Sequence, residues 1–356
     1  MVQVRQRESN IELLRLVVMA FIVLHHFIFH GLGQYRYLAF GEEPLLTPSQ
    51  INYALIADSF LIAAVDVFIL ISGYFSIKFK ANSFVKLFGM VSFFSMIGFC
   101  NYLYGNGLLG GVIGSILRVI QRGTCVMSNQ TFWFIQLYFI LMFLSGAINK
   151  YVEHASKKHL VSTIGFLAFV NIYLGWIHGV GFVKDGYNIL NFVMLYLIGR
   201  YLRLHYRKNL SKTKDIAIYL SMSVLTAVCA LLLYQFGKDT YWVFCYNSPF
   251  VLLSAISIFM FFSKLHFNSK IINYMASSCL AIYLMQEGGI SLYKQIKESY
   301  LQYGICVYFI LMILLFFVIS MIAPLIIDKI RLLVFGRAET WVSEKLDSLF
   351  FRRWLE

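Results

Sequence analysis

Residues 11–30 read IELLRLVVMAFIVLHHFIFH and form the first of many long apolar runs in the chain. A run of about 20 such residues is long enough to cross a lipid bilayer as a helix. This one nevertheless contains Arg15, His25 and His26. Because ionizable groups are costly in hydrocarbon, those within membrane helices generally face the protein interior or a water-filled cavity. The stretch therefore predicts a membrane protein with a polar cavity beside its first helix.

The spacing of these residues indicates how they are arranged. Arg15 and His26 are eleven positions apart, which on a helix returns to within about 20° of the same face, about 16 Å along the axis. His25 points about 80° away from that line. We therefore expect Arg15 and His26 to be stacked along one cavity. The alternative is that Arg15 extends to the inner interface while both histidines are hydrogen-bonded within the bundle.

The composition extends the membrane prediction to the whole chain. Of its 356 residues, 60% are hydrophobic and 13% are charged, whereas soluble domains are about 25% charged. The apolar runs are spread from end to end, which favours one all-α polytopic bundle over two domains. About ten membrane spans are predicted, at residues 11–30, 51–75, 84–104, 131–149, 159–177, 187–204, 215–236, 247–264, 271–289 and 303–327.

The loop charges orient this bundle. With the N-terminus inside, 22 of the 30 Lys and Arg residues fall in inner segments, 7 fall in outer segments, and Arg15 lies within the first span. This asymmetry follows the positive-inside rule and predicts that both termini are cytoplasmic. It also accounts for the net charge of +13 without a nucleic-acid site. The six cysteines show no pattern typical of a metal site, so no metal is expected.

Two segments are not predicted to span the membrane. Residues 106–122 are predicted to be an interfacial or re-entrant segment on the outer side. Residues 331–356 mix Leu, Phe and Trp with Arg and Lys, which is typical of an amphipathic helix lying on the inner leaflet. The predicted organisation is thus a membrane domain at residues 8–330 followed by an amphipathic cytoplasmic tail.

The second span contains further polar candidates. Asp58 and Asp66 would lie about 80° apart on one helix, with Asp66 near the middle of the membrane. A buried Asp66 hydrogen-bonded to neighbouring helices is the simpler interpretation, and a catalytic or ion-binding role is the alternative. The span ends FILISGYF at residues 68–75, where Ser72 and Gly73 are small enough to allow close helix approach.

The ends of other spans supply the remaining candidates. Trp133 is expected at the outer interface, where aromatic belts are common. Arg200, with Lys86, is expected near the cytoplasm, where the two act either as an anion site for phosphates or as ordinary positive-inside anchors.

The ninth span ends AIYLMQEGG, which places three polar side chains near the depth of His26: Tyr283, Gln286 and Glu287. A carboxylate beside a histidine orients the ring and raises its basicity, as general-base chemistry requires. Glu287 is the candidate for that role. The alternative is that Glu287 is simply the first solvated residue of a loop.

Several of these segments resemble the integral-membrane acyltransferase 3 family. The run IELLRLVVMAFIVLHHF is similar to its opening motif, in which an Arg is followed after ten residues by a His, here Arg15 and His26. FILISGYF resembles its Phe-x-x-x-Ser-Gly-Tyr/Phe signature. FWFIQLYFILMFLSGAIN resembles its Trp-Phe-led helix, and two later segments resemble the polysaccharide O-acetyltransferase branch: GYNILNFVMLYLIGRYLR and YNSPFVLLSAISIFMFF.

The resemblance implies transfer of an acetyl group from cytoplasmic acetyl-CoA, the co-substrate, to a hydroxyl of a cell-surface polysaccharide or its lipid-linked precursor. It implies that His26 is the catalytic base or the acyl carrier and that Arg15 helps to hold the donor. We expect a multi-pass protein of the bacterial inner (plasma) membrane. The full predicted site has Glu287 beside His26, donor-binding Arg15, Ser72, Lys86 and Arg200, and supporting His25, Asp66, Tyr74, Trp133, Tyr283 and Gln286.

The chain departs from the family pattern at two places. Gln286 stands where members often have a His, and the third span keeps Lys86 but lacks the Arg-rich, Pro-containing form of relatives. An alternative function is a proton-coupled transporter of glycans or small molecules, with Asp58, Asp66 and His26 as the proton relay. Transporters of this kind usually have interrupted helices. Only Pro249 and Pro324 fall in predicted spans, which argues against such interruptions.

Overall fold

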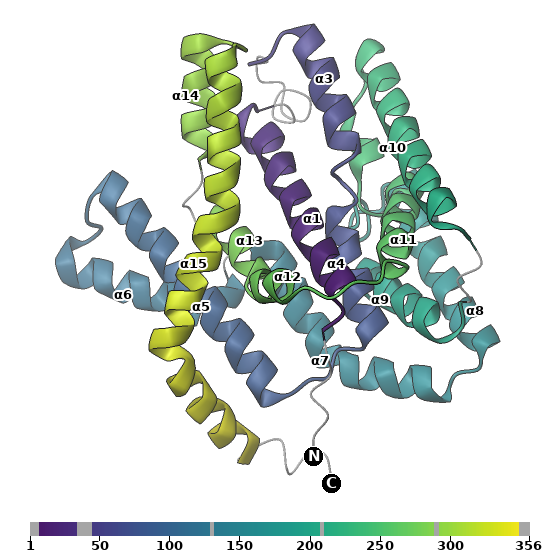
Figure 1. Ribbon diagram of the computed structural model, residues 1–356, viewed down its shortest axis with the longest axis horizontal. Coiled ribbons are helices and arrows are strands. Elements are labelled where there is room, and N and C mark those ends of the chain that lie inside the picture. Colours follow the sequence, from purple (N-terminus) through teal and green to yellow (C-terminus); the bar gives the residue numbers. More distant parts are fainter. Residues whose placement is uncertain (1–6, 34–44, 129–131, 207–209, 288–291, 349–356) are drawn as a thin grey trace.

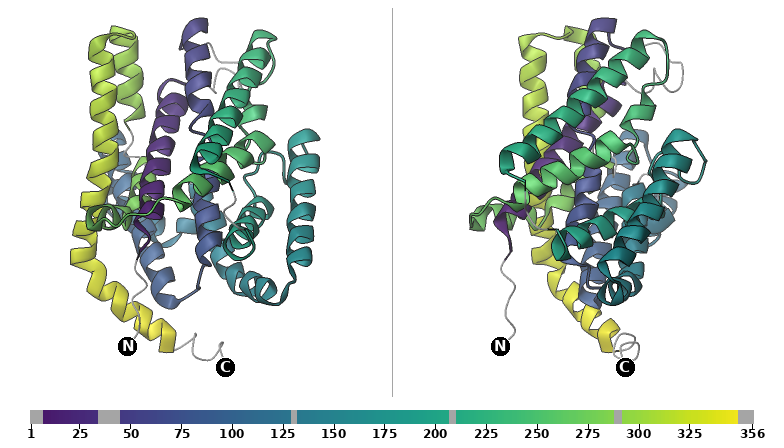
Figure 2. Two further views of the ribbon diagram at one scale, coloured as in Figure 1. Left: turned by 45° about the vertical axis from the view of Figure 1, so that its right-hand side comes forward. Right: turned by 90° about the vertical axis from the view of Figure 1, so that its right-hand side faces the viewer.

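A computed structural model describes residues 7–33, 45–128, 132–206, 210–287 and 292–348. Regular structure within these ranges is helical, without strands. Figures 1 and 2 show helix α1 (Ser9–His26) in the middle of the bundle, with α14 and α15 on one side and α10 and α11 on the other. The predicted all-α polytopic bundle is confirmed.

Helix α1 packs one face into the core and ends at the predicted histidines. Leu14 and Val18, one helical turn apart, are fully buried, as is Val23. After His26 the helix continues as a π-helical turn, η1 (Phe27–Gly31). Such wide turns are frequent at functional sites because they change the direction of the side chains. The two histidines therefore lie where the first helix changes its winding.

The predicted span 51–75 is two helices rather than one. Helix α3 (Pro48–Ser59) begins with Pro48 at its first position, and helix α4 (Ala64–Phe75) follows after a non-α turn at residues 60–63. The Phe60 carbonyl at this break accepts a hydrogen bond of 2.6 Å from the Tyr219 hydroxyl, which satisfies a backbone group freed by the break. The prediction of few interrupted helices is therefore wrong for this span. The break consists of Phe60, Leu61, Ile62 and Ala63, without Gly or Pro.

The remaining helices surround α1 and α4. They are α5 (Ala81–Asn106), α6 (Gly111–Thr124), α7 (Trp133–His154), α8 (Lys157–Ala168) with its π-helical continuation η4 (Phe169–Ile177), α9 (Ile189–Leu204), α10 (Lys212–Gln235), α11 (Pro249–Ser263), α12 (Lys270–Ala276), α13 (Cys279–Glu287), α14 (Tyr293–Tyr303) and α15 (Val307–Leu346), with short 3-10 turns η2 (Val126–Ser128) and η5 (Tyr241–Phe244).

Within the described ranges, eight helical stretches are long and apolar enough to span a membrane, and they coincide with eight of the ten predicted spans. The other two predicted spans are shorter elements. The span at 187–204 is the 16-residue helix α9. The span at 271–289 is divided into α12 and α13, of seven and nine residues, too short to cross a bilayer singly.

Helices α4 and α9 cross at two glycines. A Cβ atom on Gly73 would lie 2.1 Å from the carbonyl oxygen of Tyr196, and one on Gly199 would lie 2.4 Å from that of Leu70. Neither position has room for any larger residue. The close approach predicted from the Ser-Gly pair is confirmed, and it fixes α4 in the centre of the bundle.

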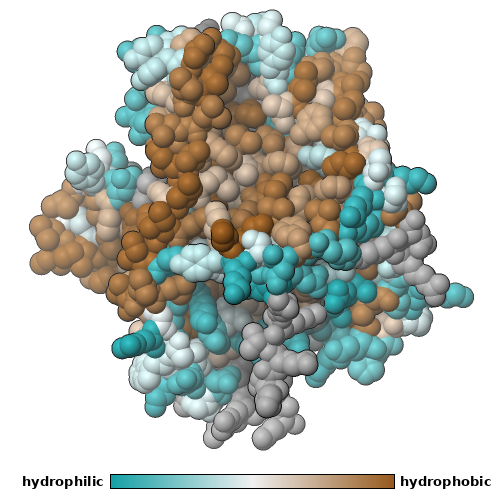
Figure 3. Space-filling view, viewed as in Figure 1, coloured by the Kyte–Doolittle hydropathy of each residue, from teal (hydrophilic) through white to brown (hydrophobic). Residues whose placement is uncertain are grey.

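Two peripheral segments carry much of the exposed apolar surface. Helix α6 projects from the side of the bundle (Figure 1) and exposes Val112, Ile113 and Ile116, as suits the predicted interfacial segment. Figure 3 shows hydrophobic side chains over α6 and α15 and across the upper part of that face, above a hydrophilic band. An apolar surface of this extent indicates a lipid bilayer as the surroundings.

Helix α15 is continuous through the predicted boundary at residue 331. Within it Arg331, only 2% exposed, pairs with Asp328 at 2.7 Å and with Glu339. Figure 1 shows α1 rising from its first residue and α15 descending to its last, so the two helices run in opposite directions. The described ends of the chain therefore face one side of the bundle. The assignment of that side to the cytoplasm stays a prediction.

Candidate functional site

Two cavities lie side by side within the bundle. The first, the histidine cavity, has a volume of about 270 Å³ and is lined by His25, His26 and His30 together with several aromatic rings. The second, the arginine cavity, has a volume of about 420 Å³ and is lined by Arg15, Ser72, Lys78, Ser83 and neighbouring apolar residues. Both cavities share three lining residues, Phe68, Phe134 and Leu280. These three side chains, the apolar partition, separate a histidine end from an arginine end.

The line from Arg15 to His26 therefore runs from one cavity to the other. Both residues lie on α1, and the first lines the arginine cavity while the second lines the histidine cavity. In place of the one cavity expected from their spacing, the described structure has two adjoining cavities, one for each residue. His25 also lines the histidine cavity, although helix geometry alone had placed it off the line.

His26 contacts the side-chain amide of Gln286. Its Nδ1 lies 3.2 Å from Oε1 of Gln286, a buried residue of α13. Because an amide oxygen only accepts hydrogen bonds, Nδ1 donates and the lone pair of the neutral ring is on Nε2. The neighbouring Glu287 is the last residue of α13, and its side chain lies outside the described part of the chain. The predicted pairing of Glu287 with His26 therefore stays a prediction.

His25 has the carboxylate partner instead. Its Nδ1 lies 2.6 Å from Oδ1 of Asp58, which is completely buried at the end of α3. The His25 ring also stacks on Phe29, with ring centroids 5.6 Å apart. The sequence predicted a role for Asp58 only in the alternative proton relay, and not as the partner of His25. The break at residues 60–63 ends α3 there, and no sequence signal marks it.

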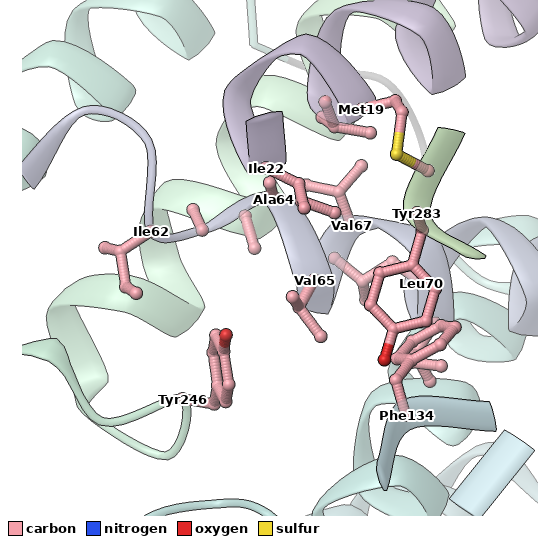
Figure 4. Packing of buried hydrophobic residues seen from close by; sticks show 14 of the residues in the cluster. Met19, Ile22, Ile62, Ala64, Val65, Val67, Leu70, Phe134, Tyr246 and Tyr283 are labelled. Atoms are coloured by element: carbon pink, nitrogen blue, oxygen red, sulfur yellow. The ribbon is translucent and has the colours of Figure 1, made fainter. Parts of the chain in front are cut away.

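Aromatic rings form much of the wall of the histidine cavity. Trp133 packs against Tyr187, with centroids 4.3 Å apart, and stacks on Tyr246 at 5.7 Å. Figure 4 shows Tyr283 and Phe134 together on one side of Val65, with Tyr246 on the other. Trp133 and Tyr283, which were predicted to support the site, thus line this cavity. His30 also lines this cavity and stacks on Tyr293. It was not among the predicted site residues.

The arginine cavity contains only part of the predicted donor site. Arg15 is one-third exposed and its guanidinium lies 3.6 Å from Glu12. Ser72 also lines the cavity and donates a hydrogen bond of 2.9 Å to the Phe68 carbonyl. The second cation of this lining is Lys78. It was predicted only as one of the cations of the inner segments.

Three predicted residues lie elsewhere in the described structure. Lys86 is exposed on α5, and neither it nor Arg200 belongs to the lining of the two cavities. The Tyr74 hydroxyl accepts a hydrogen bond of 3.1 Å from Arg203, whose guanidinium also lies over the Tyr74 ring. Positive charge near the cytoplasm is common in membrane proteins. Positive charge alone therefore does not show whether a residue anchors the helix at the membrane surface or binds the donor.

Within the described structure, Asp66 is buried without the hydrogen bonds that the simpler interpretation predicts. It is 1% exposed, and among the described residues neither of its carboxyl oxygens has a hydrogen-bond partner. It does not belong to the lining of either cavity. The predicted hydrogen bonds to neighbouring helices are thus not found among the described residues, and the acid that contacts a cavity histidine is Asp58.

A family model for an acyltransferase domain matches residues 8–328. The chain belongs to this acyltransferase family. The match covers both cavities and every described residue of the predicted site, so the resemblance inferred from the motifs is confirmed at the level of the family. No curated protein and no solved structure matches the chain significantly.

An acyltransferase with this geometry can keep two substrates apart. The cations of the arginine cavity suit an anionic ligand, whereas the histidine cavity offers two imidazoles for proton transfer or nucleophilic attack. The apolar partition between them offers water no hydrogen-bonding side chain where the two ends meet. Exclusion of water matters to acyl transfer because water competes with the acceptor for the activated acyl group.

Proposed function

We propose that this membrane acyltransferase transfers an acetyl group from cytoplasmic acetyl-CoA to a hydroxyl of a cell-surface polysaccharide or of its lipid-linked precursor. The observation that carries the proposal is the pair of adjoining cavities, with Arg15 in one, His26 in the other and the apolar partition between them. The enzyme is proposed to act in the bacterial inner membrane. Membership of an acyltransferase family supports this proposal over the alternative of a transporter.

The arginine cavity is the proposed donor site. Coenzyme A carries phosphate groups, which Arg15 and Lys78 attract by charge-assisted hydrogen bonds. With the phosphates at these cations, the flexible thiol arm extends along the cavity and presents the thioester at the apolar partition. Phe68 and Phe134 there pack against the arm and limit the access of water to the thioester.

The histidine cavity is the proposed acceptor site. Sugar rings have apolar faces that pack on aromatic side chains, and Trp133, Tyr187 and Tyr246 offer such surfaces beside the histidines. His26, with its lone pair on Nε2, either takes the proton of the acceptor hydroxyl or carries the acetyl group. Both roles require the tautomer that Gln286 stabilises.

The test uses purified enzyme in proteoliposomes with labelled acetyl-CoA and a panel of methyl glycosides. The wild-type enzyme should acetylate at least one glycoside, and His26→Ala should lose this activity by about 10²-fold or more. His178→Ala is the matched control, because His178 is exposed at the end of η4, away from both cavities. Equal rates for His26→Ala and His178→Ala would refute the role of His26.

The acceptor is identified by a cellular comparison. NMR spectra of the cell-surface glycan with and without the gene should differ by an O-acetyl signal, and the sugar that carries it is the acceptor. Unchanged spectra, together with no acetylation of any glycoside, would refute the proposed substrate class.

A further inference from the structure

Two adjacent histidines line one cavity with different partners. His25 contacts a carboxylate oxygen of Asp58 at 2.6 Å, and His26 contacts the amide oxygen of Gln286 at 3.2 Å. The two imidazole rings lie close together, with centroids 5.6 Å apart. Acyl transfer through a covalent intermediate uses both a base for the hydroxyl proton and a nucleophile that carries the acyl group. Two histidines with unlike partners can divide these tasks.

The partner of His25 is the one that general-base chemistry requires. A carboxylate that accepts a hydrogen bond from Nδ1 fixes the ring orientation, leaves the lone pair on Nε2, and stabilises the imidazolium formed when Nε2 takes a proton. The amide oxygen of Gln286 fixes the same tautomer for His26. The buried carboxylate of Asp58 positions the His25 ring so that its Nε2 can accept a proton.

The surrounding structure fixes the position of Asp58. Its side chain is completely buried, and its carbonyl oxygen accepts hydrogen bonds from the backbone N–H groups of Leu61 and Ile62 at 2.9 and 3.0 Å. These bonds close the turn between α3 and α4, so the helix break itself fixes the position of the acid. Stacking on Phe29 holds the His25 ring from another side.

We propose that His25, positioned by Asp58, is the general base that takes the proton of the acceptor hydroxyl, and that His26 carries the acetyl group between the two substrates. This inference rests on the proposed function and deepens it, because it decides between the two roles open to His26.

The proposed reaction has two steps, each with one bond formed and one bond broken at the acetyl carbon. Nε2 of His26 attacks the thioester carbonyl carbon, a C–N bond forms, the C–S bond breaks, and coenzyme A leaves as its thiolate. Nε2 of His25 then takes the proton of the acceptor hydroxyl while the oxygen attacks the acetyl carbon. The C–N bond breaks, its electron pair returns to Nε2 of His26, and the ester is released. The proton on His25 passes to the thiolate, so the products are the acetyl ester and coenzyme A.

The experiment separates the two half-reactions in the purified enzyme, with labelled acetyl-CoA and the methyl glycoside that the wild type uses best. Without glycoside, the wild type and His25→Ala should both acquire a labelled acetyl group, and His26→Ala should acquire none. With glycoside, the wild type should discharge the label. His25→Ala should discharge it about 10²–10⁴-fold more slowly, with an unchanged KM for acetyl-CoA.

Imidazole in the buffer supplies the decisive readout. It should restore discharge in His25→Ala, where removal of the ring leaves space for it. It should not restore discharge in Asp58→Asn, where the ring is still present in a poorly positioned state. Loss of packing alone would not be repaired by a soluble base. Because His25→Ala leaves a buried carboxylate unpaired, the double variant His25→Ala/Asp58→Ala serves as a second host for the imidazole rescue.

Discharge by His25→Ala at the wild-type rate, or by both His25 variants without any response to imidazole, would overturn the base assignment. A wild type that transfers acetyl groups without ever acquiring label, or label on His26→Ala, would overturn the carrier assignment. Absence of transfer by the wild type to every glycoside would instead count against the proposed function.

Discussion

The crossing of α4 and α9 makes a quantitative prediction for Gly73→Ala. The new Cβ would lie 2.1 Å from the Tyr196 carbonyl oxygen, whereas ordinary contacts begin at 3.4 Å. The two backbones would therefore have to separate by about 1.3 Å, the difference of these distances. Overpacking usually costs about 1–3 kcal/mol. We expect about 3 kcal/mol here, because the obstacle is backbone and has no alternative rotamer.

This separation should also reduce catalysis. Phe68 and Ser72 lie on α4 and line the arginine cavity, so they would move with the helix. A displacement of about 1 Å in a site can lower the rate about 10²-fold. Thermal unfolding in detergent and acetyl transfer by the remaining folded protein measure the two effects separately.

The matched control is Gly146→Ala on α7, where a Cβ meets no atom within 4 Å. In a helix interior this change should stabilise the protein by about 0.5–1 kcal/mol, because Ala loses less conformational freedom than Gly on folding. If Gly73→Ala and Gly146→Ala unfolded at the same temperature, the close crossing of α4 and α9 would be refuted.

Three further predictions concern single side chains. Arg15→Ala should raise the KM for acetyl-CoA about tenfold or more in steady-state assays, since one charge-assisted hydrogen bond contributes about 1.5–3 kcal/mol; an unchanged KM would exclude it from the donor site. Gln286→Met should lower kcat by removing the acceptor for Nδ1 of His26 while Gln286→Glu keeps it, and equal kcat values for the two would contradict the tautomer assignment. Tyr219→Phe should cost about 1 kcal/mol of unfolding free energy in thermal assays by leaving the Phe60 carbonyl unpaired; a wild-type melting temperature would show that the break needs no such bond.

The sequence predicted the bundle and the axis of its site well, because both depend on local patterns. Hydropathy identified the apolar helices, and helical periodicity aligned Arg15 with His26. It did not predict the partner of His25, because that contact depends on a helix break at residues 60–63, a stretch without Gly or Pro. Breaks of this kind depend on tertiary hydrogen bonds such as the one from Tyr219.

The donor residues show a different limit of sequence reasoning. Lys78, Lys86 and Arg200 are all cations expected near the cytoplasm, and nothing in their neighbours distinguishes a ligand from an anchor. Only Lys78 belongs to the lining of the arginine cavity. Arg15 could be singled out because a cation inside an apolar helix is rare enough to indicate a function.

The apolar partition has an electrical consequence as well as a chemical one. Moving one elementary charge across an energised plasma membrane involves about 2.3 kcal/mol for each 100 mV. An enzyme proposed to take its donor from one side and its acceptor from the other must therefore avoid a continuous path for ions. Phe68, Phe134 and Leu280 offer ions no ligands where the cavities meet. In the proposed reaction they limit ion leakage at the place where the acetyl group, which is neutral, passes from one cavity to the other.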